Sequence, residues 1–199
     1  MQLLYLFGFF LALLSSLLLI PLLTTYASLL GLIDNPIGSA RKLHKAPMPR
    51  SGGLGIIIPT AIAILVVLPW NHSVLSFLLS CLVIVGFGLL DDIIELKPIQ
   101  KLIGQTLGVT LAMVGGMVIS DVPFIDNAPA WISYALTYVF VMAVINGVNF
   151  SDGMDGLAAG ITLMALVLIF LLAREGGVIY AAIIAAIISA ALVGFLHFN

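Results

Sequence analysis

Long apolar runs separated by short polar segments dominate the chain. Seven of these runs approach the roughly 20 residues that a helix needs to cross a bilayer. They cover residues 3–23, 55–70, 74–90, 99–119, 131–148, 157–173 and 178–196. Strands of a transmembrane barrel would be about 9–11 residues long with alternating polarity, whereas these runs are longer and apolar on every face. The pattern therefore predicts an all-α, polytopic transmembrane bundle of about seven spans.

The composition excludes most other classes of protein. Hydrophobic residues make up 62% of the chain and charged residues 8%, whereas soluble domains carry about 45–50% and about 25%. So few charges exclude a soluble enzyme or a disordered chain, and the single cysteine excludes a disulfide scaffold. The first run lacks the basic residues that begin a signal peptide, so we expect it to be retained. We expect one integral-membrane domain over residues 1–199.

The basic residues predict the orientation in the membrane. Six of the seven Lys and Arg residues lie between the first and second runs, between the third and fourth, or in the first turn of the fourth. Basic loops stay in the cytoplasm, so the N-terminus should be outside and the C-terminus cytoplasmic. Asp91, Asp92, Asp152 and Asp155 follow the third and fifth runs and fall on the same predicted face. The acids and the basic loop should therefore meet at the cytoplasmic surface.

Asp91 and Asp92 follow directly after the third run. Carboxylates beside the hydrocarbon are costly and mark functional sites, and the C-terminal end of a helix disfavours them further. A bound cation would relieve both costs, and Mg²⁺ takes one or two carboxylates together with substrate phosphates. The alternative is a solvated, inert pair of acids at the membrane boundary.

A second polar cluster covers residues 146–156, between the fifth and sixth runs. Asn149 could donate to a phosphate or ligate a metal, and Asp152 and Asp155 are three residues apart. The glycines among them make a regular helix less favourable and would let the backbone approach a ligand. The alternative is a glycine-rich turn that the acids cap.

The loop 41–53 holds four Lys and Arg residues together with His44. It could bind phosphates, set the membrane topology, or attract anionic lipid. Lys101 could reach a phosphate or extend to the interface, and Gln105 lies one turn further on the same face. Gly104 and Gly108 form a small-residue pattern that favours helix packing more often than dimerisation, which leaves a homodimer as an alternative.

Together, in this order, these motifs resemble the polyprenyl-phosphate N-acetylhexosamine-1-phosphate transferases, a glycosyltransferase family 4 group that includes MraY and the WecA/TagO enzymes. The resemblance spans nearly the whole chain, and the Pro-Arg-Ser-Gly-Gly loop favours the WecA/TagO branch. The motifs that carry it are His44-Lys45, Pro49-Arg50-Ser51-Gly52-Gly53, Gly88-Leu89-Leu90-Asp91-Asp92, Lys101-Leu102-Ile103-Gly104-Gln105 and Asn149-Phe150-Ser151-Asp152-Gly153-Met154-Asp155-Gly156-Leu157.

The resemblance implies a bacterial inner-membrane enzyme that initiates the synthesis of a cell-envelope polysaccharide. It would transfer a sugar-1-phosphate from a UDP-N-acetylhexosamine, with N-acetylglucosamine favoured, to undecaprenyl phosphate. Asp91 or Asp92 would engage or deprotonate the lipid phosphate, and Asp152 would bind Mg²⁺. The substrates would also be bound by His44, Lys45, Arg50, Lys101, Asn149 and Asp155. The expected partners are these two substrates and the lipid bilayer, and nucleic acid is not expected.

Relative to the family pattern the sequence is short. Family members usually have about ten or eleven spans, and a later Gly-Asp motif and a histidine-rich loop do not occur here. We therefore expect this chain alone to show little turnover. Two other functions stay open, an inactive remnant and a membrane transporter, although transporters place acids near the midplane and in repeated halves.

Overall fold

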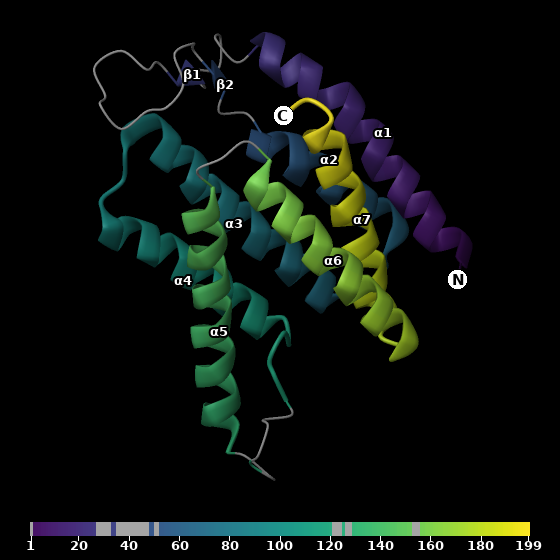
Figure 1. The fold of residues 1–199 in the computed structure, drawn as a ribbon. Helices are drawn as coiled ribbons and strands as arrows, with labels where there is room; N and C mark the ends of the chain where they lie inside the picture. Colours follow the sequence, from purple (N-terminus) through teal and green to yellow (C-terminus); the bar gives the residue numbers. More distant parts are fainter. Residues whose placement is uncertain are drawn as a thin grey trace. The chain divides into compact units, whose positions relative to one another are not determined.

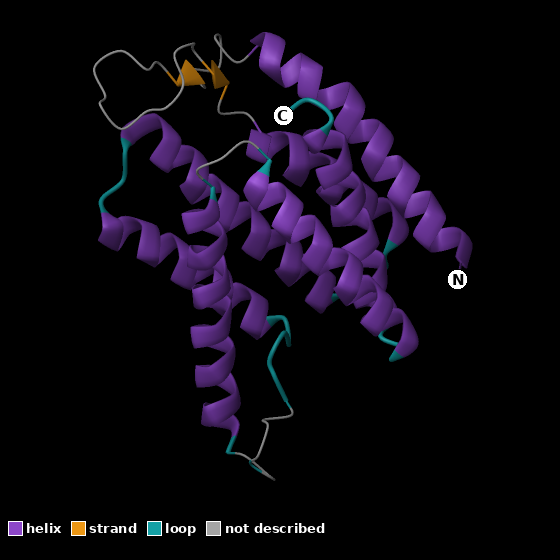
Figure 2. Ribbon diagram, viewed as in Figure 1, coloured by secondary structure: helices purple, strands orange, loops and turns teal. Residues whose placement is uncertain are grey.

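The computed structural model describes residues 2–26, 33–34, 48–49, 52–120, 125, 129–152 and 156–199, and these residues are almost entirely helical (Figures 1 and 2). Its helices are α1 (Gln2–Tyr26), α2 (Gly52–Val67), α3 (His72–Ile94), α4 (Pro98–Val114), α5 (Ala130–Ser151), α6 (Leu157–Glu175) and α7 (Ile179–Leu196). The strands β1 (Ile33–Asp34) and β2 (Met48–Pro49) pair in antiparallel fashion, with Ile33 opposite Pro49. The predicted all-helical architecture is confirmed apart from this strand pair.

Each predicted span corresponds to one described helix, although the helices differ in length. Five of them are long and apolar enough to cross a membrane, namely α1, α3, α5, α6 and α7. The other two, α2 and α4, have 16 and 17 residues. The chain is thus a multi-pass membrane protein, whereas seven spans and the orientation of the termini stay predictions.

Helix α4 ends earlier than the predicted span, which reached residue 119. Gly116 has a φ of 90°, and the Met117 amide donates to the Ala112 carbonyl at 3.1 Å. This geometry satisfies a carbonyl of the last turn and stops the helix, because a left-handed residue cannot continue it. Hydropathy alone did not detect this stop, since residues 117–119 are as apolar as the helix itself.

The described residues divide into two compact units. The first contains α1, α2, α7, the part of α6 from Ala159 onward, and residues Asp92–Ile94. The second contains α3 as far as Asp91, together with α4 and α5. The expectation of one integral-membrane domain stays a prediction.

In the first unit, α7 supplies half of the buried residues. It is rich in alanine, and small residues let membrane helices approach each other closely. A Cβ added at Gly55 of α2 would lie 2.5 Å from Ile20 of α1, and one added at Gly194 would lie 2.6 Å from the Ser16 hydroxyl. These close approaches pack α1 against α2 and α7.

Ser16 links three helices of this unit. Its side chain is fully buried and its hydroxyl donates to the Ala191 carbonyl at 3.0 Å and the Gly55 carbonyl at 3.2 Å. Hydrogen bonds between membrane helices contribute about 0.6 kcal/mol on average and at most about 1.7. A buried hydroxyl with two acceptors therefore stabilises the packing of α1 against both neighbours.

Replacing Ser16 with alanine should lower the free energy of unfolding by about 0.6–1.7 kcal/mol, because both acceptors lose their donor. Ser189→Ala is the matched control, since Ser189 is also buried but its hydroxyl has no hydrogen-bond partner among the residues that the structure describes. Thermal unfolding in detergent, followed by loss of the monodisperse species, measures both variants. A larger loss of stability in Ser189→Ala than in Ser16→Ala would contradict this account.

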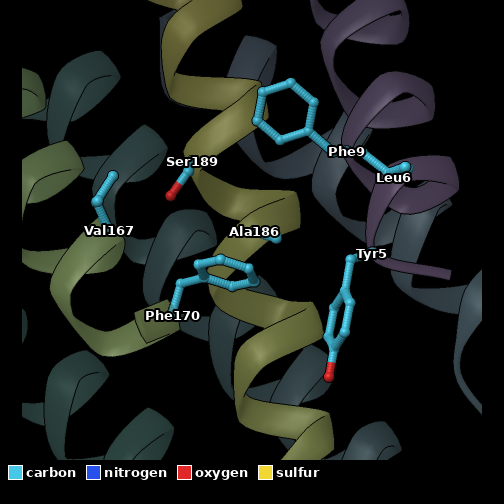
Figure 3. A pocket seen from close by; sticks show the side chains of 7 residues that line it. All are labelled: Tyr5, Leu6, Phe9, Val167, Phe170, Ala186 and Ser189. Atoms are coloured by element: carbon cyan, nitrogen blue, oxygen red, sulfur yellow. The ribbon is translucent and has the colours of Figure 1, made fainter. Parts of the chain in front are cut away.

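A hollow of about 170 Å³ lies among α1, α6 and α7 of the first unit (Figure 3). Tyr5 and Phe170 meet edge to face beside it, with ring centroids 5.8 Å apart. Its lining residues are Tyr5, Leu6, Phe9, Val167, Phe170, Ala186 and Ser189. The lining carries no charged group, so the hollow is unsuited to phosphate chemistry.

In the second unit, α4 packs against α3 through glycines. A Cβ at Gly104 would lie 2.2 Å from Cγ of Phe87, and one at Gly108 would lie 2.4 Å from Cγ1 of Ile84. The prediction that this small-residue pattern serves helix packing is confirmed. Dimerisation is not tested by these contacts.

Candidate functional site

Asp91 lies inside the last turn of α3. The helix continues to Ile94 and stops at Glu95, which has a φ of 51° in the left-handed region. The Leu96 amide donates to Oδ1 of Asp91 at 2.9 Å, and the Glu95 amide donates to the Asp91 carbonyl at 2.9 Å. The acids thus lie at the C-terminal end of the helix as predicted, although the helix continues one turn beyond the predicted span, and Oδ1 of Asp91 accepts from the amide beyond that end.

The side chain of Asp91 is ion-paired with Lys101 of α4. Lys101 Nζ lies 2.7 Å from Asp91 Oδ2. Pro98 begins α4, which suits the first helical position, and the Lys97 amide donates to Oε1 of Gln100 at 2.8 Å. This start places Lys101 in the first turn, so the cation offsets a carboxylate that the C-terminal end of α3 disfavours.

The ion pair is open to solvent. The side chain of Lys101 is 42% exposed and that of Asp91 is 28% exposed. Exposed pairs contribute little to stability because water screens them and two long side chains lose freedom. An accessible carboxylate beside an accessible ammonium group is instead suited to exchanging partners with a charged ligand.

One turn further along, α4 is joined to α5 by two amide side chains. Nδ2 of Asn146 donates to Oε1 of Gln105 at 3.1 Å, and Nε2 of Gln105 donates to Oδ1 of Asn146 at 3.4 Å. Nδ2 of Asn146 also donates to the Met142 carbonyl at 2.8 Å within α5. Both amides are part-buried, so the pair satisfies polar groups that would otherwise face an apolar surrounding.

Helix α5 extends through the glycine-containing cluster as far as Ser151. The glycines of residues 146–156 were expected to make a regular helix less favourable. This expectation is wrong for residues 146–151, whereas Gly156 lies in a turn with a φ of 69°. A glycine costs a helix only about 1 kcal/mol, which a membrane helix with internally satisfied backbone groups tolerates. Asn149 lies in the last turn and is exposed, and its carbonyl accepts from the Asp152 amide at 3.3 Å.

Asp152 follows α5 directly and its side chain is exposed. Mg²⁺ takes one or two carboxylates and completes its shell with water and substrate phosphates, and a single exposed carboxylate fits that requirement. In the part of the chain that the structure describes, no group of three or more His, Cys, Asp or Glu side chains could hold a metal. The assignment of Asp152 to Mg²⁺ stays a prediction.

Of the residues predicted for the site, the structure brings Asp91 and Lys101 into contact. Asp92 is exposed and follows Asp91 within α3. Asn149 and Asp152 lie together at the end of α5. Four further predicted residues lie outside the described residues, namely His44, Lys45, Arg50 and Asp155.

Sequence reasoning did not assign Asn146, and it gave Gln105 no partner. Both residues were visible as amides inside motif segments, but amides are also common at helix ends and turns. Only the antiparallel packing of α4 against α5 shows that they face each other. Gln105 lies four residues after Lys101, and Asn146 lies three residues before Asn149. This spacing was the signal from which the pairing of Gln105 with Asn146 could have been predicted.

Comparison with known proteins agrees with these features. Residues 74–199 match the family model described as glycosyl transferase family 4. The chain is 32% identical over 198 residues to a probable undecaprenyl-phosphate N-acetylglucosaminyl 1-phosphate transferase of Bacillus subtilis, covering 96% of this chain and 54% of that protein. It is 32% identical over 202 residues to a decaprenyl-phosphate N-acetylglucosaminephosphotransferase of Mycobacterium tuberculosis, covering 87% of this chain and 48% of that protein.

A third relative carries a different name. A phospho-N-acetylmuramoyl-pentapeptide-transferase of Lacticaseibacillus paracasei is 32% identical over 173 residues, which cover 78% of this chain and 54% of that protein. The chain thus spans about half the length of these curated relatives. The family model nevertheless matches well over half of the chain, including Asp91, Lys101 and Asp152. The chain therefore belongs to glycosyl transferase family 4.

Proposed function

We propose that this protein transfers N-acetylglucosamine-1-phosphate from UDP-N-acetylglucosamine to undecaprenyl phosphate. The products are a lipid-diphosphate-sugar and UMP, and the reaction begins the synthesis of a cell-envelope polysaccharide. The observation that carries the proposal is the contact between Asp91 and Lys101 at 2.7 Å. Sequence motifs assign both residues to phosphate chemistry, and they meet at an accessible helix end. The names of the relatives support the sugar and the lipid acceptor.

In the proposed reaction an oxygen of the lipid phosphate forms a bond to the phosphorus that carries the sugar. The bond from that phosphorus to the bridging oxygen breaks, and UMP leaves with the bond's electron pair. Asp91, with Asp92 beside it, engages the lipid phosphate and accepts its remaining proton. Lys101, released from Asp91, neutralises a phosphate oxygen in the crowded anionic site. Phosphoryl transfer depends mainly on such positioning and charge neutralisation.

The nucleotide would be held at the end of α5. Asn149 is exposed there and can donate to a phosphate through its amide, and Asp155 completes that side of the site in our proposal. Asp152 would bind Mg²⁺, which when bound neutralises the phosphate oxygens and lowers the repulsion between the two substrates. His44, Lys45 and Arg50 of the basic loop would bind further phosphate oxygens.

The proposed setting is the bacterial inner membrane with the site on the cytoplasmic face. The bias of Lys and Arg towards the loops on one side supports that orientation. UDP-sugars are water-soluble and polyprenyl phosphates are membrane-bound, so a site at the boundary gives both substrates access. The exposure of Asp91 and Lys101 agrees with such a position.

The assay measures the transfer of radiolabelled N-acetylglucosamine phosphate to undecaprenyl phosphate. Membranes of a strain that overproduces the protein from its own gene are compared with membranes of a strain that lacks it. We expect Mg²⁺-dependent formation of labelled lipid with an equal amount of UMP, and inhibition by EDTA. Labelled lipid without UMP, or no difference between the two membranes for any UDP-N-acetylhexosamine, would refute the proposed reaction.

A further inference from the structure

We propose that Gln105 and Asn146 are positioning residues that hold Lys101 and Asn149 at one site. Their paired amides set the rotation and the register of α4 against α5. The effect of the pair on catalysis rests on the proposed function. The effect of the pair on the positions of Lys101 and Asn149 can be tested without measuring turnover. Neither residue need touch a substrate in this role.

The order of the contacts shows that α4 and α5 run antiparallel. Gln105 contacts Asn146, Thr106 contacts Tyr138, and the Ile119 amide beyond α4 donates to Oγ1 of Thr137. Residue numbers therefore rise along one helix as they fall along the other. In Figure 1 the two helices cross, with α5 drawn in front of α4.

This order places the two predicted ligand-binding residues on the same side of the amide pair along their helices. Lys101 lies one turn before Gln105 in α4, and Asn149 lies about one turn after Asn146 in α5. Residues three or four apart share a helix face, so each binding residue stands on the same face as its amide neighbour. The amide pair is therefore the contact between α4 and α5 nearest to Lys101 and Asn149 among those described.

The amide pair constrains the rotation of α4 against α5 more than the contact between the hydroxyl groups of Thr106 and Tyr138 does. Each amide both donates and accepts, and Asn146 is also anchored to the Met142 carbonyl. The contact between Oγ1 of Thr106 and the Tyr138 hydroxyl, at 2.9 Å, is a single hydrogen bond at the end of a long side chain. One such bond can persist while the helices rotate, whereas a two-point contact between planar amides cannot.

Rotation of α4 would move Lys101 directly. Its ammonium group faces Asp91 of α3, while Asn149 belongs to α5, so α4 must stay in register with both neighbours. A misplacement of about 1 Å at a reacting group can cost roughly 100-fold in rate. We therefore expect the amide pair to act on the efficiency of transfer through Lys101.

Four variants of the amide pair and one control separate positioning from stability. Gln105→Leu and Asn146→Leu each remove one amide, and the double variant removes both without leaving an unpaired buried group. The exchange Gln105→Asn with Asn146→Gln restores an amide pair of the same combined length. Thr106→Val is the matched control, because it removes the other polar contact between the same two helices.

The geometric readout uses one chain that carries Lys101→Cys and Asn149→Cys, with the native cysteine removed by Cys81→Ala. A short bis-maleimide links them, and mass spectrometry measures the yield in membranes. We expect the yield to fall at least about threefold in the Leu variants and to recover in the exchange variant. The kinetic readout, in chains that keep Lys101 and Asn149, should show kcat/KM lowered about 10- to 100-fold by the Leu variants. The exchange variant and Thr106→Val should stay within about threefold.

Unchanged cross-linking in the double Leu variant would overturn the inference. So would equal losses in Thr106→Val and the Leu variants, because the pair would then only stabilise the unit. If the parent protein shows no transfer but cross-linking depends on the amides, the proposed function fails while the positioning geometry is supported. Transfer that is intact in the double Leu variant would refute the catalytic consequence and leave the proposed function standing.

Discussion

Asp91→Asn should lower the rate of sugar-phosphate transfer by about 100- to 10,000-fold, the range for loss of a group that handles a proton in the reaction. Asparagine is nearly isosteric with aspartate and keeps the Oδ1 acceptor for the Leu96 amide, so the end of α3 should survive. It loses the charge that pairs with Lys101 and the ability to accept a proton from the lipid phosphate. The measurement is UMP release from UDP-N-acetylglucosamine with undecaprenyl phosphate and Mg²⁺, in membranes that contain the protein expressed from its own gene.

The matched control is Glu95→Gln. Glu95 is an exposed acid four residues further along the same helix end, and the substitution removes one charge without changing its length. We expect its transfer rate to stay within about threefold of the parent protein. A rate for Asp91→Asn as high as that of Glu95→Gln would show that the Asp91 carboxylate takes no part in the chemistry.

Gly104→Ala should lower the free energy of unfolding of the second unit by about 1–3 kcal/mol. The added Cβ would lie 2.2 Å from Cγ and 2.7 Å from Cβ of Phe87. These atoms are close to the Phe87 backbone, so rotation of the ring cannot relieve the overlap and α3 and α4 must separate. Alanine gains about 1 kcal/mol in helix propensity over glycine, and we expect the overlap to outweigh this gain.

Gly86→Ala in α3 provides the comparison, because a Cβ there meets no atom within 4 Å. The gain in helix propensity should then appear as unchanged or raised stability. Thermal unfolding of both variants in the same detergent measures the difference. If Gly104→Ala proved as stable as Gly86→Ala, the close approach of α4 to Phe87 would not exist in the membrane.

The helices were predictable from the sequence because burial in lipid leaves few choices. A segment without water must satisfy its backbone groups internally, so an apolar run of the right length becomes a helix whatever its neighbours are. The ends of α1, α6 and α7 lie within a few residues of the predicted limits. The motifs likewise placed Asp91 and Lys101 in the candidate site, since both are charges at the ends of apolar runs.

Helix ends and side-chain partners depended on local geometry and on packing. The left-handed Glu95 and Gly116 end α3 and α4 at positions that hydropathy does not mark. Helix α5 runs through Gly147 although the sequence there favours a turn.

The sequence by itself determined that the chain is a membrane bundle with charged motifs at the ends of its helices. Tertiary structure alone decided that Asp91 meets Lys101 and that Gln105 meets Asn146. Hydropathy measures only transfer from water to lipid, which is the same for every rotation of a helix that is apolar all round. Specific contacts between helices, such as Gly104 against Phe87 and one amide against another, select the rotation and thereby the partners.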